Sequence, residues 1–173
     1  MFYELRQSYE PRASLIPVAR RLTLPTELWM GGANALHGEL LEPGRLADTW
    51  IIDLAGDLPD THREAAGLWL PRVFTDSETE PSNFDRLCDL AESVAAALTG
   101  APAVPGWPHP SEPPSRLYVM CQQGLNRSGL VTGLILRALG HSVEETLAAI
   151  ATRRGALNNQ TYVRLLRGEA PTR

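Results

Sequence analysis

The sequence contains no lysine, so all 16 of its basic residues are arginines. These arginines face 20 acidic residues, and the formal net charge of -4 argues against a surface that coats nucleic acid. A local anion site is still compatible with this balance. Because lysine is absent, phosphate contacts must come from guanidinium groups or backbone amides.

Long apolar runs are missing as well. No stretch approaches the roughly 18 apolar residues of a membrane-spanning helix. The opening MFYELRQSYEPR also lacks the charged and then apolar layout of a signal peptide. We therefore expect a cytoplasmic protein without membrane insertion.

Cysteine is scarce, with only Cys88 and Cys121 in the chain. Cys88 falls on the apolar stripe of a predicted helix, where we expect a small core residue. Cys121 ends a predicted strand beside a glycine-containing loop. These different surroundings predict two unpaired cysteines, which suits a reducing compartment.

The 173 residues fit one domain, and an apolar fraction of 43% is ordinary for a globular chain. Segment 101–115 reads APAVPGWPHPSEPPS and contains six prolines, which exclude a helix or a central strand. We expect a surface insertion there. A proline-rich docking segment for a partner is the alternative, although no arginine-flanked PxxP pattern accompanies it.

Short apolar runs alternate with segments of helical spacing over the rest of the chain. Pro71 lies within the apolar run 68–74 and removes a backbone donor. It therefore places this predicted strand at a sheet edge or breaks it. Residues 22–24 and 28–30 predict a hairpin-like entry, after an extended arm over the first twenty residues. The predicted strands are 50–54, 68–74 and 116–120, and the predicted helices are about 82–99, 127–139, 142–154 and 160–167.

Two helix starts carry a capping-box pattern, Ser82 with Asp85 and Ser142 with Glu145. Strands interleaved with helices, and helices concentrated toward the C-terminus, predict an α/β fold. We expect a single layered domain over 1–173 with a central, mostly parallel sheet flanked by helices.

The run LYVMCQQGLNRSG, which ends at Gly129, is the part of the sequence that indicates chemistry. An apolar strand ends at Cys121, and Arg127 begins a buried helix after five loop residues. Such a connection points backbone N–H groups into one concavity, and the helix dipole adds positive partial charge. The loop therefore predicts a cup for a tetrahedral anion such as phosphate. The predicted phosphate-binding residues are Gln122, Gln123, Gly124, Leu125, Asn126 and Arg127.

The side chains around this cup predict a nucleophilic mechanism. The field that attracts phosphate also favours the thiolate of Cys121. Arg127 can bind two phosphate oxygens at once. Gly124 permits a close approach of the backbone to the ligand. Ser128 is placed to give its hydroxyl to the sulfur when the thiolate leaves a cysteinyl-phosphate intermediate.

The same residues resemble a known family. CQQGLNRSG is similar to the C-x5-R-[S/T] signature loop of the cysteine-dependent protein tyrosine phosphatases, and the chain is most similar to their small dual-specificity branch. WIIDLAG resembles a central strand of that branch, VFTDSETEP its general-acid loop, and RGALNNQTYVRLL the end of its catalytic domain. The resemblance implies a phosphatase-like catalytic domain that needs no metal or organic cofactor. It assigns the nucleophile to Cys121, the phosphate and transition-state clamp to Arg127, the thiolate helper to Ser128 and the general acid to Asp76.

The chain departs from the family at Met120, which stands where a histidine usually precedes the nucleophile. The stretch between Asp76 and Cys121 is also longer than usual, and the proline-rich insertion explains the excess. Asp76 has a chemical case of its own, because an ester leaving group needs a proton at its oxygen. A solvated acidic turn is the competing interpretation, and Asp53 and Asp57 are weaker candidates for the acid.

Several functions remain open at this stage. We expect hydrolysis of a phosphomonoester on a phosphorylated protein side chain. The alternatives are an RNA 5′-phosphatase, a phosphoinositide phosphatase, a sulfurtransferase and a phosphate-binding module without turnover. No evident basic or aromatic track accompanies the loop, which disfavours RNA. Asn158 and Asn159 either brace the loop or cap the last helix.

Overall fold

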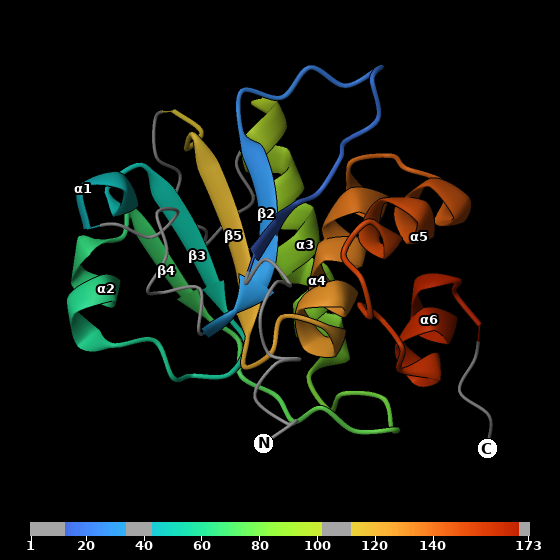
Figure 1. Ribbon diagram of the computed structural model, residues 1–173. Coiled ribbons are helices and arrows are strands. Elements are labelled where there is room, and N and C mark those ends of the chain that lie inside the picture. The colour runs from blue at the N-terminus through green and yellow to red at the C-terminus, as the bar shows by residue number, and fades with distance from the viewer. Residues whose placement is uncertain (1–12, 34–42, 102–111, 170–173) are drawn as a thin grey trace, which may run out of the picture.

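The computed structural model describes residues 13–33, 43–101 and 112–169. Its centre is a five-stranded sheet with the strand order β1-β2-β5-β3-β4 (Figure 1). Every neighbouring pair is parallel except β1 and β2, which are antiparallel. The strands are β1 Ala13–Leu15, β2 Glu27–Gly32, β3 Thr49–Asp53, β4 Leu68–Pro71 and β5 Arg116–Cys121.

Helices cover both faces of this sheet. The helices are α1 Pro43–Leu46, α2 Asp60–Ala65, α3 Phe84–Thr99, α4 Asn126–Ala138, α5 Val143–Ala151 and α6 Gln160–Leu166. In Figure 1, α1 and α2 lie on one side of the sheet, and α3 to α6 lie on the other. This arrangement confirms the predicted α/β layers and the mostly parallel sheet.

Two apolar cores result from the alternation of side chains along the strands. Val119 and Cys121 of β5 belong to the larger core, which includes residues of α3 to α6. Tyr118 and Met120 belong to the smaller core with Leu46 of α1. Because β5 is buried on both faces, its sequence is a nearly continuous apolar run.

Most predicted elements are confirmed. All five residues of β3 are buried, as the short apolar run indicates. β4 forms an edge of the sheet and ends at Pro71, in agreement with the missing backbone donor. The capping box of α5 is present, with Ser142 and Glu145 bonding each other's backbone N–H groups.

Other predictions were wrong in part. The antiparallel partner of β2 is Ala13–Leu15, within the expected arm, and not residues 22–24. At α3 the N-cap is Asn83, whose side chain makes no capping bond, so the box expected at Ser82 does not form. The helix expected to reach Arg154 ends at Ala151. The short helices α1 and α2 were not predicted, since four and six residues carry little periodic signal.

Of the expected insertion at 101–115, the structure describes residue 101 and residues 112–115. Pro114 is buried, and its carbonyl accepts a hydrogen bond from Thr26 Oγ1 at 2.6 Å. Ser115 donates from its backbone N–H and its hydroxyl to Asp48. The last residues of segment 101–115 are therefore packed against the sheet. Residues 102–111 lie outside the described residues. So do the first twelve residues of the expected arm.

Membrane insertion was not expected from the sequence. Within residues 13–33, 43–101 and 112–169, no helix combines the length and the apolarity that crossing a bilayer requires.

Candidate active site

The predicted cup lies at the carboxyl end of the central strand. β5 sits between β2 and β3, and Cys121 is its last residue, with 3% of its surface exposed. The chain turns through residues 122–125 and enters α4 at Asn126. Open α/β sheets bind ligands outside the carboxyl ends of their strands, so this placement suits a binding site.

Two polar groups lie close to the sulfur, an N–H that donates to it and a hydroxyl that accepts from its thiol. The backbone N–H of Gly124 donates to Cys121 Sγ at 3.2 Å. The hydroxyl of Ser128 lies 3.5 Å from the same sulfur and is fully buried. Both groups can donate to a thiolate, which is the arrangement expected from the sequence.

Arg127 joins the cup to its surroundings. Its Nη1 donates to the carbonyls of Leu54 and Phe74, at 3.2 and 3.0 Å. A cavity of about 190 Å³ lies beside it. Cys121 and Asp76 line the same cavity, so the structure brings the predicted nucleophile, arginine and acid together. The remaining lining residues are Gln122, Gln123, Leu125 and Asn126.

Gly124 occupies a position that excludes any side chain. Its φ of 70° lies in the left-handed region. A Cβ there would overlap the backbone of Gly31 and Gly32 at the end of β2. A Cβ on Gly32 would in turn lie 2.8 Å from the carbonyl oxygen of Gln122. The glycine pair at the end of β2 therefore lets the loop pack against the sheet.

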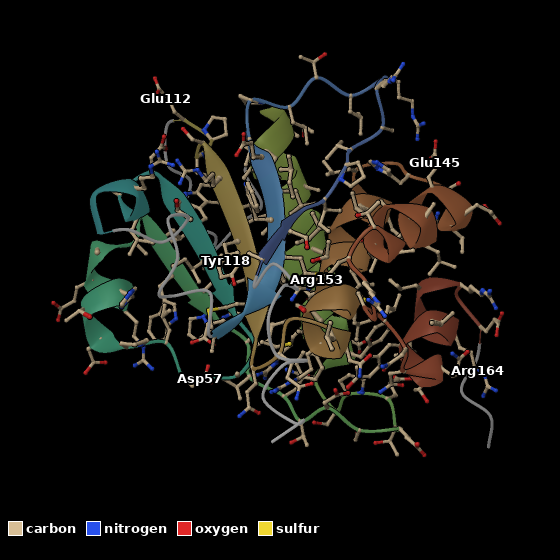
Figure 2. The ribbon with its side chains drawn as sticks, viewed as in Figure 1. Asp57, Glu112, Tyr118, Glu145, Arg153 and Arg164 are labelled. Atoms are coloured by element: carbon tan, nitrogen blue, oxygen red, sulfur yellow. The ribbon has the colours of Figure 1, made fainter. Side chains whose placement is uncertain are left out.

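Arg153 is a supporting residue that the sequence did not reveal. It follows α5, and only 7% of its surface is exposed (Figure 2). Its Nε donates to the carbonyl of Gly124 at 2.6 Å, and its Nη2 to that of Gln123 at 3.4 Å. Its Nη1 donates to Ser14 Oγ at 3.0 Å. These bonds hold two loop carbonyls toward the guanidinium. No local motif could have indicated them.

Met120 stands where the family usually has a histidine, and it packs away from Cys121. Its side chain is fully buried in the smaller core, on the opposite face of β5 from Cys121. Next to it, the hydroxyl of Tyr118 donates to the carbonyl of Gly32 at 2.8 Å. Burial raises the pKa of this tyrosine, which keeps the hydroxyl protonated as a donor. This hydrogen bond from Tyr118 thus fixes the carboxyl end of β2.

Asp76 lies on the segment after β4, at the exposed rim of the cup. Its Oδ2 accepts from Asn126 Nδ2 at 3.1 Å, and its Oδ1 accepts from Asn159 Nδ2 at 3.2 Å. Asn159 also caps α6 through its Oδ1. The capping interpretation of this asparagine is therefore confirmed, and its side chain braces the segment of Asp76 and not the loop after Cys121. The side chain of Asn158 is exposed.

The two weaker candidates for the acid are placed elsewhere. Asp53 is fully buried, and its Oδ1 accepts from the backbone N–H groups of Ala55 and Gly56 at 3.1 and 2.7 Å. Its carboxylate therefore serves the turn after β3. Asp57 is exposed on the loop between β3 and α2 (Figure 2), and it does not line the cup.

The part of the chain that the structure describes holds no cluster of three His, Cys, Asp or Glu side chains that could bind a metal ion.

Comparisons with known proteins identify the fold. No protein-family model and no curated protein sequence matches the chain. Human DUSP28 matches with a TM-score of 0.61 and 20% identity, over 92% of this chain and 93% of that chain. A mouse putative dual specificity phosphatase, complexed with zinc tungstate, matches with a TM-score of 0.62 and 20% identity, over 93% and 87%. The human tyrosine phosphatase-like serine/threonine/tyrosine-interacting protein matches at 0.56 and 15%, over 82% and 89%. The chain therefore has the fold of the cysteine-dependent protein tyrosine phosphatases, in the form of their small dual-specificity branch.

Proposed function

We propose that this protein hydrolyses phosphomonoesters through a cysteinyl-phosphate intermediate, and that its substrates are phosphorylated side chains of proteins. The main support is the geometry of one cavity of about 190 Å³, which Cys121, Arg127 and Asp76 line together. The two cysteines are unpaired, which is consistent with a reducing compartment such as the cytoplasm.

In the first step, the thiolate of Cys121 attacks phosphorus, and the bond from phosphorus to the ester oxygen breaks. Asp76, in its acid form, gives a proton to that oxygen, so the product leaves as a neutral alcohol or phenol. Arg127 uses its Nη1 on two carbonyls. Its Nε and Nη2 donors are left to hold two equatorial oxygens of the transferring group.

In the second step, water attacks the phosphorus of the intermediate. The Asp76 carboxylate accepts a proton from this water, which returns the acid to its starting state. The sulfur leaves as a thiolate, and the Ser128 hydroxyl at 3.5 Å donates a hydrogen bond to it. Inorganic phosphate is released, and atoms and charges balance over the cycle.

The lining of the cup favours a single phosphate group on a protein. Arg127 is the one cation among the described lining residues, and Asp76 lines the same cavity. A phosphoinositide or an RNA 5′-triphosphate carries several negative charges, and this rim would not neutralise them. These two substrate classes are therefore alternatives with weaker support.

A phosphate-binding module without turnover is the other alternative. The fold alone does not exclude it, because the similar structures include a phosphatase-like interacting protein. A module that only binds has no need for a nucleophile and an acid on one cavity. The same reasoning disfavours a sulfurtransferase, which needs no Asp76.

A substrate panel tests the proposal. Phosphate release is measured with a phosphotyrosine peptide, a phosphothreonine peptide, a phosphoinositide and an RNA 5′-triphosphate, with Cys121→Ser as the inactive control. We expect turnover of a phosphopeptide that the control abolishes. Turnover restricted to the lipid or the RNA would overturn the substrate class, and release from none of the four would overturn the enzymatic proposal.

A further inference from the structure

Side chains at α6 make hydrogen bonds with the backbone of the segment that carries Asp76. The hydroxyl of Tyr162, which is fully buried, donates to the carbonyl of Thr75 and accepts from the N–H of Ser77, both at 3.3 Å. Asn159 Nδ2 donates to the carbonyl of Ser77 at 2.7 Å. Burial raises the pKa of Tyr162, so its hydroxyl stays protonated in neutral solution.

Two further bonds hold the ends of this segment. Arg127 donates to the carbonyl of Phe74 at 3.0 Å, and Thr161 Oγ1 donates to the carbonyl of Glu78 at 2.6 Å. The backbone on either side of Asp76 is therefore held by the start of α4 and by the first turn of α6. An acid on such a segment can stand at the cup before a substrate arrives.

The carboxyl group itself lies between two amides. Asn126 approaches from the phosphate loop and Asn159 from the start of α6, and each donates to a different oxygen of Asp76. Asn126 and Asn159 are also joined, because Asn126 Oδ1 accepts from the backbone N–H of Asn159 at 3.1 Å. These contacts link positions 50 and 83 residues away from Asp76 in the chain. We call the two asparagines the amide clamp.

We propose that Asn126 and Asn159 are positioning residues that hold the Asp76 carboxyl group at the cup in the orientation needed for proton transfer. An exposed aspartate samples several rotamers, and fixing it during the reaction would cost conformational entropy. The amide clamp already orders the side chain in the folded protein, so this entropy is not lost during the reaction. Preorganisation of this kind accelerates a step. This inference rests on the proposed function, because it assumes that Asp76 acts as the acid.

Asn159→Asp separates positioning from capping. An aspartate at this position keeps the acceptor oxygen for Thr161 N and Tyr162 N, and it is as good an N-cap as asparagine. It has no N–H to donate to Asp76 or to Ser77. Asn158→Asp is the matched control, since it adds the same charge one residue earlier, on a side chain that makes no hydrogen bond with the described residues.

The readout is the dependence of turnover on the leaving group. We expect Asn159→Asp to lower kcat for phenyl phosphate by on the order of 10-fold, which is part of the ~10²- to 10⁴-fold that a positioned acid contributes. A nitrophenyl phosphate, whose leaving group needs little protonation, should lose less than about 3-fold. Inhibition by vanadate should match that of Asn158→Asp.

A double-mutant cycle tests Asn126. In the Asp76→Ala background, Asn126→Ala should cause no further loss on phenyl phosphate, although it does so in the wild-type background. Losses that simply add would overturn the role of Asn126. Equal losses on both substrates, or a variant Asn159→Asp that behaves like Asn158→Asp, would overturn the clamp and leave the proposed function standing. A wild-type protein without turnover would overturn the proposed function itself.

Discussion

The two cysteines of this chain lie in opposite electrostatic surroundings. Cys88 is half-buried on α3, where burial raises the pKa of its thiol and the carboxylates of Asp85 and Glu92 raise it further. Cys121 has a backbone N–H and a hydroxyl within 3.5 Å of its sulfur and a helix N-terminus above it. One thiol is thus kept neutral, and the other is surrounded by groups that stabilise an anion.

This contrast predicts selective alkylation. Iodoacetate reacts with thiolates, so at pH 7 we expect Cys121 to be modified at least ~10-fold faster than Cys88. Peptide mapping over time measures both rates in one sample. Phosphate or vanadate should protect Cys121 and leave Cys88 unaffected. Equal rates, or a lack of protection, would show that the loop is not an anion cup.

Asp76 has a separate prediction. Asp76→Asn keeps the size of the side chain and should leave folding and substrate binding unchanged, while it removes the transferable proton. We expect turnover to fall by ~10²-fold or more for substrates with poor leaving groups, and by much less for an activated phenol. Steady-state kinetics on the two kinds of ester checks this. A uniform loss, or none at all, would mean that another group supplies the proton.

The sequence predicted those site residues that stand close together along the chain. The cup between Cys121 and Ser128 is a local motif, so strand, loop and helix could be inferred from one segment. Arg153 bonds to Gly124 across 29 residues, and Asn159 bonds to Asp76 across 83. Such contacts depend on how the elements pack, and one sequence carries no local signal for them.

At the scale of elements, the corner between α4 and α5 holds the segment that precedes β2. His141 is 2% exposed, and its Nε2 accepts from the backbone N–H of Ala19 at 2.9 Å. Its Nδ1 donates to the carbonyl of Leu136 at 3.0 Å. Nearby, Arg21 binds both carboxylate oxygens of Glu145 at 2.5 and 2.7 Å. The accepting Nε2 requires a neutral ring.

Stability should therefore fall in mild acid. Burial lowers the pKa of His141 below its ordinary value, although the Leu136 carbonyl and Glu145 oppose this shift. The unfolded chain then binds the proton more tightly than the folded chain does. The resulting stability is fully present above about pH 6.5 and is lost as the pH falls through the lower pKa of the folded state.

Urea unfolding at pH 7.5 and pH 5 measures this effect. His141→Gln keeps an acceptor near Nε2 but does not titrate, so its midpoint should fall less between the two pH values. Glu145 does not interfere, because its hydrogen bond with Arg21 lowers its pKa to about 2. The stability that ionised Glu145 contributes is lost only below the ordinary glutamate pKa of roughly 4.5. Parallel losses in the wild type and the variant would exclude His141 as the titrating group.

At the scale of the whole molecule, the predictable part of the fold is the part with a strong hydrophobic pattern. β3 and β5 are buried on both faces, and their apolar runs predicted a parallel sheet between helices. β1 has three residues, none of them fully buried, and pairs with β2 only through the tertiary fold. Its pairing could therefore not be inferred from residues 13–15.

The proline-rich segment offers the last test, because hydrogen bonds hold both of its described ends. α3 ends in a left-handed Gly100 (φ 69°), and the N–H of Ala101 returns to the carbonyl of Ala96 at 2.9 Å. On the other side, Pro114 and Ser115 are bonded to Thr26 and Asp48. We expect 102–111 to be a surface insertion that neither the sheet nor the cup requires.

Replacing 102–111 by a short Gly/Ser turn should keep turnover of an aryl phosphate within a few-fold of the wild type. Stability should change little, because loop closure costs only about 0.6 kcal/mol per doubling of loop length. Extending the replacement to 115 should cost roughly 1 to 3 kcal/mol more, since Thr26 Oγ1 would lose its acceptor in a buried position. Urea unfolding of the two variants compares them directly. If the shorter replacement already unfolds the protein, the segment packs on the core and is not a surface insertion. If the longer replacement costs no further stability, the bonds at Pro114 and Ser115 do not stabilise this end of the sheet.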